Sequence, residues 1–379
     1  MPRSRLLTAL VLASFVSAGF AAVPVPQPPA IDARAYVLMD YQTGRLLAAE
    51  KPDAQMEPAS ITKLMTGYAV FRALKEGRLK LDDPVTISEH AWKAEGSRTF
   101  AQVGTQIPVE VLIKGMTVQS GNDATIALAE KLGGTEDGFV QMMNSYAKEL
   151  GLRNSHFNDA SGLPGPTHYM SPHDIAILSR VLIRDYPEYY KYYSMREFEW
   201  NKIRQQNRNG LLAKDPSVDG IKTGHTETAG YCLASSAKRG DQRLIAVVLG
   251  TDSFKAREDA SAALLNYGFT FFETVKAKGA GEVILKPEVY KGAADRVSLV
   301  IPSDLYVTVG RGDGPQLKTA ATLKDKIIVA PIKAGQALGE LTVSNGTTVV
   351  ARVPLVAKEA VPEGGWWTRM WDGVSLWFK

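Results

Sequence analysis

The sequence predicts a mixed α/β domain, followed by a small all-β domain and a short amphipathic C-terminal helix. Three observations carry this prediction. Residues 31–275 mix strand-type and helix-type patterns, residues 276–361 consist of short β-type runs, and residues 362–379 form an amphipathic, tryptophan-rich segment. A chain of 379 residues is long enough for two domains.

The N-terminal residues 1–22 have the pattern of a secretory signal peptide. Arg3 and Arg5 precede the apolar run 6–20, and small residues follow it. The run is shorter than the ~20 residues of a membrane-spanning helix, which disfavours an uncleaved anchor. We therefore expect an exported protein whose mature chain starts with a Pro-rich linker, residues 23–30.

The first domain, residues 31–275, is predicted to contain both strands and helices. Gly77 is expected to end a helix over 61–77 that is apolar enough to be buried. The expected elements, in order, are strands 35–40 and 45–50, the helix over 61–77, two or more helices within 110–150 that include 110–118 and 124–133, strands 230–237 and 243–250, and a helix over 255–275.

The second domain, residues 276–361, contains β-type runs separated by Gly, Pro and Asp, which is typical of a small all-β module. It has no histidine and no clustered polar residues, so we expect a supporting or docking role. The runs are 282–287, 296–302, 305–310, 326–332, 339–344 and 349–357.

The C-terminal segment 364–379 is predicted to be a helix that lies in a membrane surface. It is too short and too polar to span a bilayer. The alternative is that the apolar face of this segment packs back on the protein, but a helix lying in the plane of the membrane surface fits the tryptophan content of the segment better. One face would carry Trp367, Met370, Trp371, Val374, Trp377 and Phe378, and the other Thr368, Arg369, Asp372 and Ser375.

Composition excludes some partners and cofactors. The formal net charge is only +4 and no stripe of Lys and Arg is visible, so we expect no nucleic-acid partner. The single cysteine, Cys232, cannot form an internal disulfide and is expected to be a small buried residue. No cluster of His, Cys and Asp has metal-ligand spacing, so no metal or cofactor is expected.

Ser60 and Lys63 are the first candidates for chemistry. Residues three apart share one face of a helix, so the Lys63 amine can approach the Ser60 hydroxyl. Burial or a second cation would make the neutral amine accessible, and this amine could then take the hydroxyl proton. The same S-x-x-K spacing occurs at Ser145/Lys148, on a polar helix face, and at Ser235/Lys238, at a strand end.

Two further motifs favour the first pair. Ser120-Gly121-Asn122 is the only S-x-N in the chain, and Lys222-Thr223-Gly224 is the only K-T-G. The order S-x-x-K, S-x-N, K-T-G is the signature of serine β-lactamases and penicillin-binding proteins. Each motif alone could be a cap or a turn, but the ordered triple in an exported chain indicates an active site.

With these motifs the sequence resembles the low-molecular-mass penicillin-binding proteins of the D-alanyl-D-alanine carboxypeptidase class, peptidase family S11. The similarity covers nearly the whole mature chain. It implies an α/β (α+β) serine β-lactamase/penicillin-binding-protein-like catalytic domain with an all-helical subdomain. The stretches that carry the resemblance are PASITKLMT, SGNDA, NRNGLL, VDGIKTGHTETAGYCL and LNYGFTFFETV.

The resemblance also implies roles for single residues. Ser60 would be the acylated nucleophile, Lys63 its general base and Ser120 a proton relay to the leaving amine. Asn122 would hold the substrate amide and Lys63, while Lys222 and Thr223 would bind the terminal carboxylate. The remaining implied site residues are Gly224, His225, whose backbone N–H would complete an oxyanion hole with that of Ser60, and Arg208 and Arg257 at the border of the site. The other histidines, His90, His156, His168 and His173, are expected to be structural or solvated.

The implied reaction removes the terminal D-alanine from peptidoglycan pentapeptides ending in D-Ala-D-Ala. β-Lactam antibiotics, which mimic that dipeptide, would acylate Ser60. The resemblance places the protein at the periplasmic face of the bacterial inner membrane, as a peripheral protein held through residues 364–379.

Three alternatives stay open at this point. A class A-like β-lactamase would need a deacylating glutamate between S-x-N and K-T-G, and residues 157–176 contain none. A peptidase that cuts D-Ala-diaminopimelate cross-links would share all the motifs. A non-enzymatic wall-binding protein would not need every motif residue.

Overall fold

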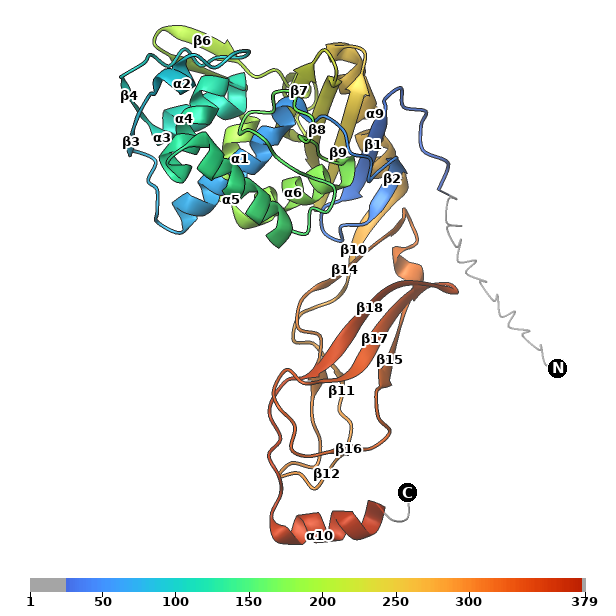
Figure 1. Cartoon of the computed structure of the whole chain (residues 1–379). Coiled ribbons are helices and arrows are strands. Elements are labelled where there is room, and N and C mark those ends of the chain that lie inside the picture. The colour runs from blue at the N-terminus through green and yellow to red at the C-terminus, as the bar shows by residue number, and fades with distance from the viewer. Residues whose placement is uncertain (1–24, 377–379) are drawn as a thin grey trace, which may run out of the picture.

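The computed structural model describes residues 25–376, which form two domains and a terminal helix arranged along one long axis (Figure 1). The predicted signal peptide and residues 377–379 lie outside the described residues. Within the described part, no helix has both the length and the apolar character needed to cross a membrane. The predicted order, a mixed α/β domain followed by a β domain, is confirmed.

The elements follow in chain order. The helices of the described chain are α1 (Lys63–Lys75), α2 (Glu89–Trp92), α3 (Val109–Lys114), α4 (Asn122–Gly133), α5 (Glu136–Glu149), α6 (Pro172–Asp185), α7 (Pro187–Tyr190), α8 (Leu211–Lys214), α9 (Phe254–Phe271) and α10 (Trp366–Ser375). Its short 3-10 or π turns are η1 (Ala59–Thr62), η2 (Gly115–Gln119), η3 (Lys191–Ser194) and η4 (Gly314–Gln316). The strands are β1 (Ala35–Asp40), β2 (Leu46–Glu50), β3 (Pro84–Thr86), β4 (Gln106–Pro108), β5 (Glu197–Trp200), β6 (Ile203–Gln206), β7 (Val218–Thr226), β8 (Gly230–Arg239), β9 (Gln242–Thr251), β10 (Phe272–Lys278), β11 (Val283–Leu285), β12 (Val289–Tyr290), β13 (Leu299–Val300), β14 (Leu305–Gly310), β15 (Leu317–Leu323), β16 (Ile328–Val329), β17 (Ala337–Asn345) and β18 (Thr348–Ala357).

A five-stranded antiparallel sheet in the order β2-β1-β9-β8-β7 forms the centre of the first domain. Along β9, alternate side chains point to opposite faces of the sheet. Ile245 and Val247 therefore enter one hydrophobic core, while Leu244 and Ala246 enter the other, which lies beneath α9. Burial on both faces explains why this strand is a nearly continuous apolar run.

Helix α1 lies between the sheet and a helical lobe that contains α2, α3, α4 and α5 (Figure 1). From Lys63 to Leu74, every residue of α1 except Arg72 is buried. A helix that is apolar on all sides is stable only inside a core, so its burial follows from its sequence. The helix ends at Lys75, and Gly77 follows with a φ of +71°, which glycine adopts at low cost.

The predicted helix over 255–275 is wrong at its C-terminal end. Helix α9 ends at Phe271, and the next residues form β10, which pairs antiparallel with β14. Aromatic and β-branched residues fit a strand well, and here Phe272 pairs with Gly310 of the second domain. Strand β10 therefore spans the boundary predicted at 275/276.

The second domain is built on the sheet β11-β13-β18-β17-β15 and the strand pairs β10-β14 and β12-β16. The six predicted β-type runs overlap with β11, β13, β14, β16, β17 and β18. The sequence did not predict the two-residue strand β12 or the edge strand β15, whose residues are mostly exposed and whose Leu317, Ala321 and Leu323 are only partly buried against the core. A separate hydrophobic core, which includes Val297, Leu299, Leu341, Val343 and Leu355, holds this domain together.

The two domains meet at a buried carboxylate. Asp40 at the end of β1 accepts hydrogen bonds from the backbone N–H and hydroxyl of Thr43, both at 2.8 Å, and from the hydroxyl of Thr274 on β10. Thr43 also lies 2.6 Å from the Thr308 hydroxyl, and Arg45 donates to the Thr308 carbonyl oxygen. Hydrogen bonds therefore join the β1–β2 turn to both strands that enter the second domain.

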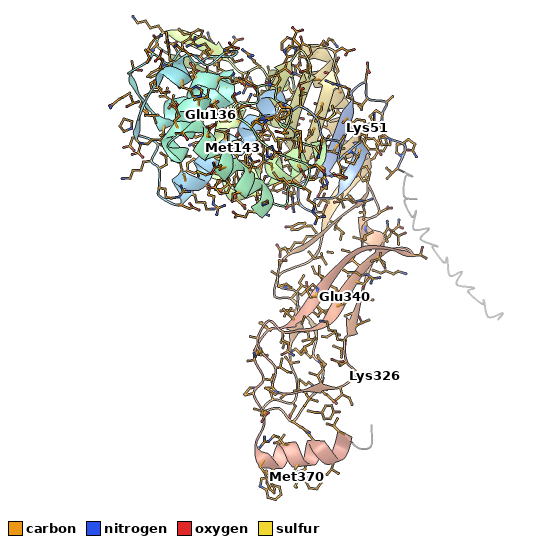
Figure 2. The ribbon with its side chains drawn as sticks, viewed as in Figure 1. Lys51, Glu136, Met143, Lys326, Glu340 and Met370 are labelled. Carbon is orange, nitrogen blue, oxygen red and sulfur yellow. The ribbon has the colours of Figure 1, made fainter. Side chains whose placement is uncertain are left out.

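Helix α10 lies across the far end of the second domain (Figure 1). Figure 2 shows Met370 at this end, with Glu340 and Lys326 between it and the first domain. The backbone N–H of Lys291 donates to the Asp372 carboxylate, and Gly364 N–H donates to the Lys291 carbonyl oxygen. Asp372 on the polar side of α10 thus contacts the domain, while Trp366, Trp367, Met370, Trp371 and Val374 are exposed.

Candidate active site

Ser60 lies in the 3-10 turn η1, immediately before α1. Pro58 precedes the turn and its carbonyl oxygen accepts from Ile61 N–H at 3.1 Å. Ala59 has a φ of +47°, a left-handed conformation that costs a non-glycine residue about 1 kcal/mol or more. Ser60 is therefore held at the mouth of a buried helix, one turn before Lys63.

Lys63 is buried and contacts the Ser60 hydroxyl directly. Its Nζ donates to Ser60 Oγ at 2.8 Å and to the Ser161 carbonyl oxygen at 2.7 Å. The pKa of Lys63 is lowered to about 7: burial is the main cause, the charge of Asp159 opposes the shift and the charge of Arg208 adds to it. A substantial fraction of this lysine is therefore a neutral amine near neutral pH.

The K-T-G motif lies within strand β7, which the sequence did not predict as a strand. Lys222, Thr223 and Gly224 are all buried at the edge of the sheet, where β7 packs on η1. A Cβ atom at Gly224 would lie 2.7 Å from the Pro58 carbonyl oxygen and 3.2 Å from the Ala59 Cβ. Only glycine lets the strand approach the Ser60 turn this closely.

Three further basic side chains, Lys222, Arg208 and Arg257, lie on or beside β7. Burial lowers the pKa of Lys222 well below its usual value, and the charges of Lys63, Arg208 and Arg257 lower it further. Arg257 is itself buried and donates to the carbonyl oxygens of Gly224 at 3.2 Å and Arg208 at 3.1 Å. The guanidinium groups of Arg208 and Arg257 thus lie close enough to act on Lys222 by charge, and this part of the site favours an anionic ligand.

Ser120 and Asn122 flank the start of α4 on the lobe side. Ser120 has a φ of +64°, and its buried hydroxyl has no hydrogen-bond partner within the described chain. Asn122 donates through Nδ2 to the Glu95 carbonyl oxygen at 2.6 Å, and its buried Oδ1 is likewise unpaired there. No hydrogen bond therefore joins Asn122 to Lys63 among the described residues; Lys63 Nζ donates to Ser60 Oγ and to the Ser161 carbonyl oxygen.

His225 follows the K-T-G motif on β7 and is exposed. Its ring stacks on Tyr231 with a centroid distance of 4.0 Å and lies near Phe254. The side chain thus packs against neighbouring aromatic rings at the edge of the site.

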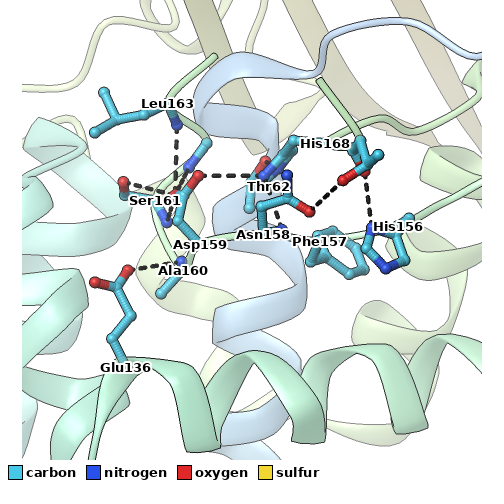
Figure 3. A network of polar contacts seen from close by, with 12 residues as sticks. Thr62, Glu136, His156, Phe157, Asn158, Asp159, Ala160, Ser161, Leu163 and His168 are labelled. Atoms are coloured by element: carbon cyan, nitrogen blue, oxygen red, sulfur yellow. Dashed lines mark hydrogen bonds and ion pairs between the residues drawn. The ribbon is translucent and has the colours of Figure 1, made fainter. Parts of the chain in front are cut away.

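A turn at residues 158–163 forms a wall of the site that the sequence did not single out. Figure 3 shows Asp159, Ser161 and His168 beside Thr62. Asp159 Oδ1 accepts from the backbone N–H groups of Ser161 and Gly162 at 2.7 and 2.6 Å, and Oδ2 lies 3.2 Å from His168 Nδ1. The only local signal was an Asp before a Ser-Gly turn, which is common in loops.

Asp123 is a second buried carboxylate that the sequence did not single out. It accepts from the backbone N–H groups of Thr99 at 2.7 Å and Ala101 at 3.0 Å. It thereby fixes the 97–101 loop to the start of α4, beside Asn122.

The site combines the Ser60 hydroxyl, the partly neutral Lys63 amine that is hydrogen-bonded to it, and the basic side chains at the edge strand β7. These are the parts of an acyl-transfer site for a substrate with a carboxylate. Among the described residues, no group of three or more His, Cys, Asp and Glu side chains is placed to hold a metal ion.

Comparisons with known families match both domains. The model for "D-alanyl-D-alanine carboxypeptidase" matches residues 22–253, and the model for "Penicillin-binding protein 5, C-terminal domain" matches residues 272–363. D-alanyl-D-alanine carboxypeptidase DacA of Escherichia coli is 41% identical over 390 aligned residues, which cover 100% of this chain and 96% of that protein. DacC of the same organism is 42% identical, with 96% of this chain and 93% of that protein covered.

Solved structures agree with these matches. Penicillin-binding protein 5 from Haemophilus influenzae superimposes with a TM-score of 0.87 and 43% identity, over 89% of this chain and 100% of that one. A mutant of the Streptomyces K15 DD-transpeptidase superimposes with a TM-score of 0.60 and 29% identity, over 64% of this chain and 99% of that one. The relatives thus share either the full two-domain arrangement or a part of it.

Proposed function

Because this chain belongs to the D-alanyl-D-alanine carboxypeptidase family of serine peptidases, we propose that it removes the terminal D-alanine of peptidoglycan stem peptides through an acyl-enzyme on Ser60. The single observation that carries this assignment is the 2.8 Å contact between Lys63 Nζ and Ser60 Oγ inside a buried site. The fold and the activity class come from the family, and the residue roles below are our inference.

In the proposed acylation, Ser60 Oγ attacks the carbonyl carbon of the penultimate D-alanine. Lys63 takes the hydroxyl proton, which its pKa of about 7 supports. The backbone N–H groups of Ser60 and His225 would stabilise the oxyanion. The C–N bond then breaks, and the leaving amine of D-alanine takes the proton held by Lys63, relayed through Ser120. Water afterwards hydrolyses the ester and restores Ser60.

Substrate binding is proposed to use the cationic edge of β7. Lys222 and Thr223 would bind the terminal carboxylate, while Arg208 and Arg257 add positive charge around it. Asn122 would hold the substrate amide, with its unpaired Oδ1 available to accept from a peptide N–H. Gly224 lets these groups approach Ser60 closely.

β-Lactams are proposed to acylate the same serine, because they present an acyl-D-Ala-D-Ala-like shape. The alternatives receive less support. A class A-like β-lactamase would need a glutamate in the loop between S-x-N and K-T-G. The 158–163 turn has one acidic residue, Asp159, and its carboxylate already accepts from the backbone N–H groups of Ser161 and Gly162 and lies beside His168. The relatives DacA and DacC are named as D-alanyl-D-alanine carboxypeptidases, not as endopeptidases or non-enzymatic wall-binding proteins.

The protein is proposed to be exported and to work at the periplasmic face of the inner membrane. Residues 1–22 would serve as signal peptide, with a linker over 23–30, and residues 364–379 would hold the chain to the membrane surface. The exposed Trp366, Trp367 and Trp371 on α10 support this anchoring.

The test combines two measurements on the mature protein. Incubation with penicillin followed by mass spectrometry should find the adduct on the peptide that contains Ser60. Release of D-alanine from a diacyl-Lys-D-Ala-D-Ala peptide should be detected, and Ser60→Ala should abolish both signals while circular dichroism stays unchanged. Folded wild-type protein that gives neither adduct nor D-alanine would refute the proposal.

A further inference from the structure

The Asp159–His168 pair lies behind Lys63 and has no part in the mechanism above. His168 is 3% exposed, and its two ring nitrogens face different partners. Nε2 lies 2.8 Å from Thr62 Oγ1, while Nδ1 lies 3.2 Å from both Asp159 Oδ2 and the backbone nitrogen of Asn158 (Figure 3). The pair thus connects the 158–163 turn to the residue just before Lys63.

The 158–163 turn is fixed on the η1–α1 segment at several points. Gly162 has a φ of +92°, and a Cβ there would overlap the Ala59 carbonyl oxygen, so the turn lies directly on the backbone next to Ser60. The polar attachments are Ser161 O with Lys63 Nζ at 2.7 Å, Ala160 O with Thr66 Oγ1 at 2.7 Å, and His168 Nε2 with Thr62 Oγ1 at 2.8 Å.

The Ser161 carbonyl decides how the amine is oriented. A neutral amine has two N–H groups and one lone pair. If one N–H donates to Ser161 O, the lone pair is free to face Ser60 Oγ, which is the geometry a general base needs. Asp159 fixes that carbonyl, because it accepts from Ser161 N–H, Ser161 Oγ and Gly162 N–H.

We propose that the Asp159–His168 pair is a positioning device for Lys63: it closes the 158–163 turn so that the Ser161 carbonyl orients the amine towards Ser60. This inference rests on the roles proposed above for Ser60 and Lys63. Asp159 and His168 do not touch the reacting atoms and act only through Ser161 and Thr62.

Charge gives the pair a second effect on the same base. Burial would raise the pKa of Asp159, but the hydrogen bond and charge of His168 and the backbone N–H groups lower it, so Asp159 is ionised. Its negative charge raises the pKa of Lys63 against the effect of burial. The other ionisable groups that act here are Glu136, which accepts from Ala160 N–H at 2.9 Å, Arg208 and Asp123, which act on Lys63 by charge, and Lys222, which interacts with Lys63 as a like charge.

The test measures acylation of the full chain by a fluorescent penicillin between pH 5 and pH 9. Asp159→Ala should slow acylation about 10- to 100-fold, because a misplaced base costs this much. Asp159→Asn keeps an oxygen for the backbone N–H groups and should recover most of the rate. In both variants the acid limb should move to lower pH, because loss of the negative charge lowers the pKa of Lys63. His168→Gln should slow acylation less than Asp159→Ala.

Asn144→Ala provides the matched control. Asn144 also makes two hydrogen bonds to this loop, donating to Phe157 O at 2.9 Å and accepting from Phe157 N–H at 3.0 Å, but it does not reach the Ser161 carbonyl. It should lower the melting temperature without moving the rate per folded molecule or the pH profile. If Asp159→Ala does not fold, the pH profile of Asp159→Asn decides.

Two outcomes would overturn the proposal. The first is that Asp159→Ala or Asp159→Asn is acylated at the same rate and with the same pH profile as Asn144→Ala. The Asp159–His168 pair would then have a purely structural role. This result would leave the proposed function intact, because wild-type Ser60 would still be labelled. Failure to label wild-type protein would overturn both.

Discussion

At the residue scale, the chemistry of the site depends on a lysine that is a base only because of where it lies. A solvated lysine, with a pKa near 10.5, is almost fully protonated at neutral pH. In α1 the same side chain is buried, so its pKa falls to about 7, and its Nζ lies 2.8 Å from Ser60 Oγ. Arg208 deepens this shift, and the acidic groups Asp159 and Asp123 limit it.

This shift predicts how acylation depends on pH. The reactive amine is the deprotonated form, so acylation should rise with pH along a limb centred near pH 7. Arg208→Gln removes a charge that lowers the pKa of Lys63, so its limb should move to higher pH. Stopped-flow labelling with a fluorescent penicillin measures both profiles. A rate independent of pH between 5 and 9 would contradict the assignment of Lys63 as base.

At the scale of elements, two segments that are far apart in the chain pack closely against the Ser60 turn. Strand β7 approaches it through Gly224, and the 158–163 turn approaches it through Gly162. At each contact the nearest atom of the Ser60 turn is a backbone carbonyl oxygen, that of Pro58 or Ala59. A side chain at either glycine would therefore force the backbone to move. The position of Ser60 therefore depends on packing between elements as much as on its own turn.

Gly224→Ala tests this close approach. The added methyl group would lie 2.7 Å from the Pro58 carbonyl oxygen, so β7 or η1 must shift. We expect penicillin acylation to slow about 10- to 100-fold and stability to fall by about 1–3 kcal/mol. The control is Gly279→Ala, whose Cβ would meet only the flexible end of Lys276 at 3.9 Å. Equal acylation by the two variants would show that the approach of β7 is unimportant.

Local sequence patterns predicted the elements unevenly, for a physical reason. The strands that became β1, β8 and β9 and the buried helix α1 were predicted because burial leaves an apolar pattern along the chain. Strand β7 was missed because its residues VDGIKTGHT include polar groups that serve the site and glycines needed for close contact. Strand β10 was taken for helix because its partner, β14, lies in the other domain.

At the scale of the whole molecule, the two domains are joined by hydrogen bonds around the buried carboxylate of Asp40. Helix α10 lies at the opposite end, with its tryptophans exposed and Asp372 bound to the backbone of Lys291. If α10 lies in a membrane surface, the second domain separates that surface from the active site (Figure 1).

Removal of residues 364–379 should release the mature protein from inner-membrane vesicles without lowering turnover on a soluble peptide. A finer variant replaces Trp366, Trp367 and Trp371 with serine and keeps the Asp372 contact. Transfer of each large apolar side chain out of water contributes about 1.5–3 kcal/mol, so binding should weaken at least ~100-fold. Arg369→Gln, on the polar face, is the control. Sedimentation measures binding, and a truncated chain that still pellets with vesicles would contradict the anchoring proposal.

Asp40→Ala should destabilise the molecule at the domain junction. It would leave the N–H of Thr43 and two hydroxyls without their acceptor, which costs about 1–3 kcal/mol. Asp53→Ala, which removes an exposed carboxylate 3.4 Å from His173, should change the free energy of unfolding by less than ~0.5 kcal/mol. Urea unfolding measures both, and equal midpoints would refute the role given to Asp40.

The sequence by itself determined the two-domain order, the buried helix behind Ser60 and the three motifs, because apolar periodicity and short fixed spacings are local properties of the chain. It gave no sign that the Ser161 carbonyl would hold Lys63, or that Asp159 and His168 would close the turn behind it. The contact between Lys63 and the Ser161 carbonyl joins residues 98 positions apart. Polar residues in a loop look the same whether solvent or a buried amine faces them. Only the tertiary structure decided which hydrogen bonds and charges surround the amine, and with them the pKa that the proposed reaction requires.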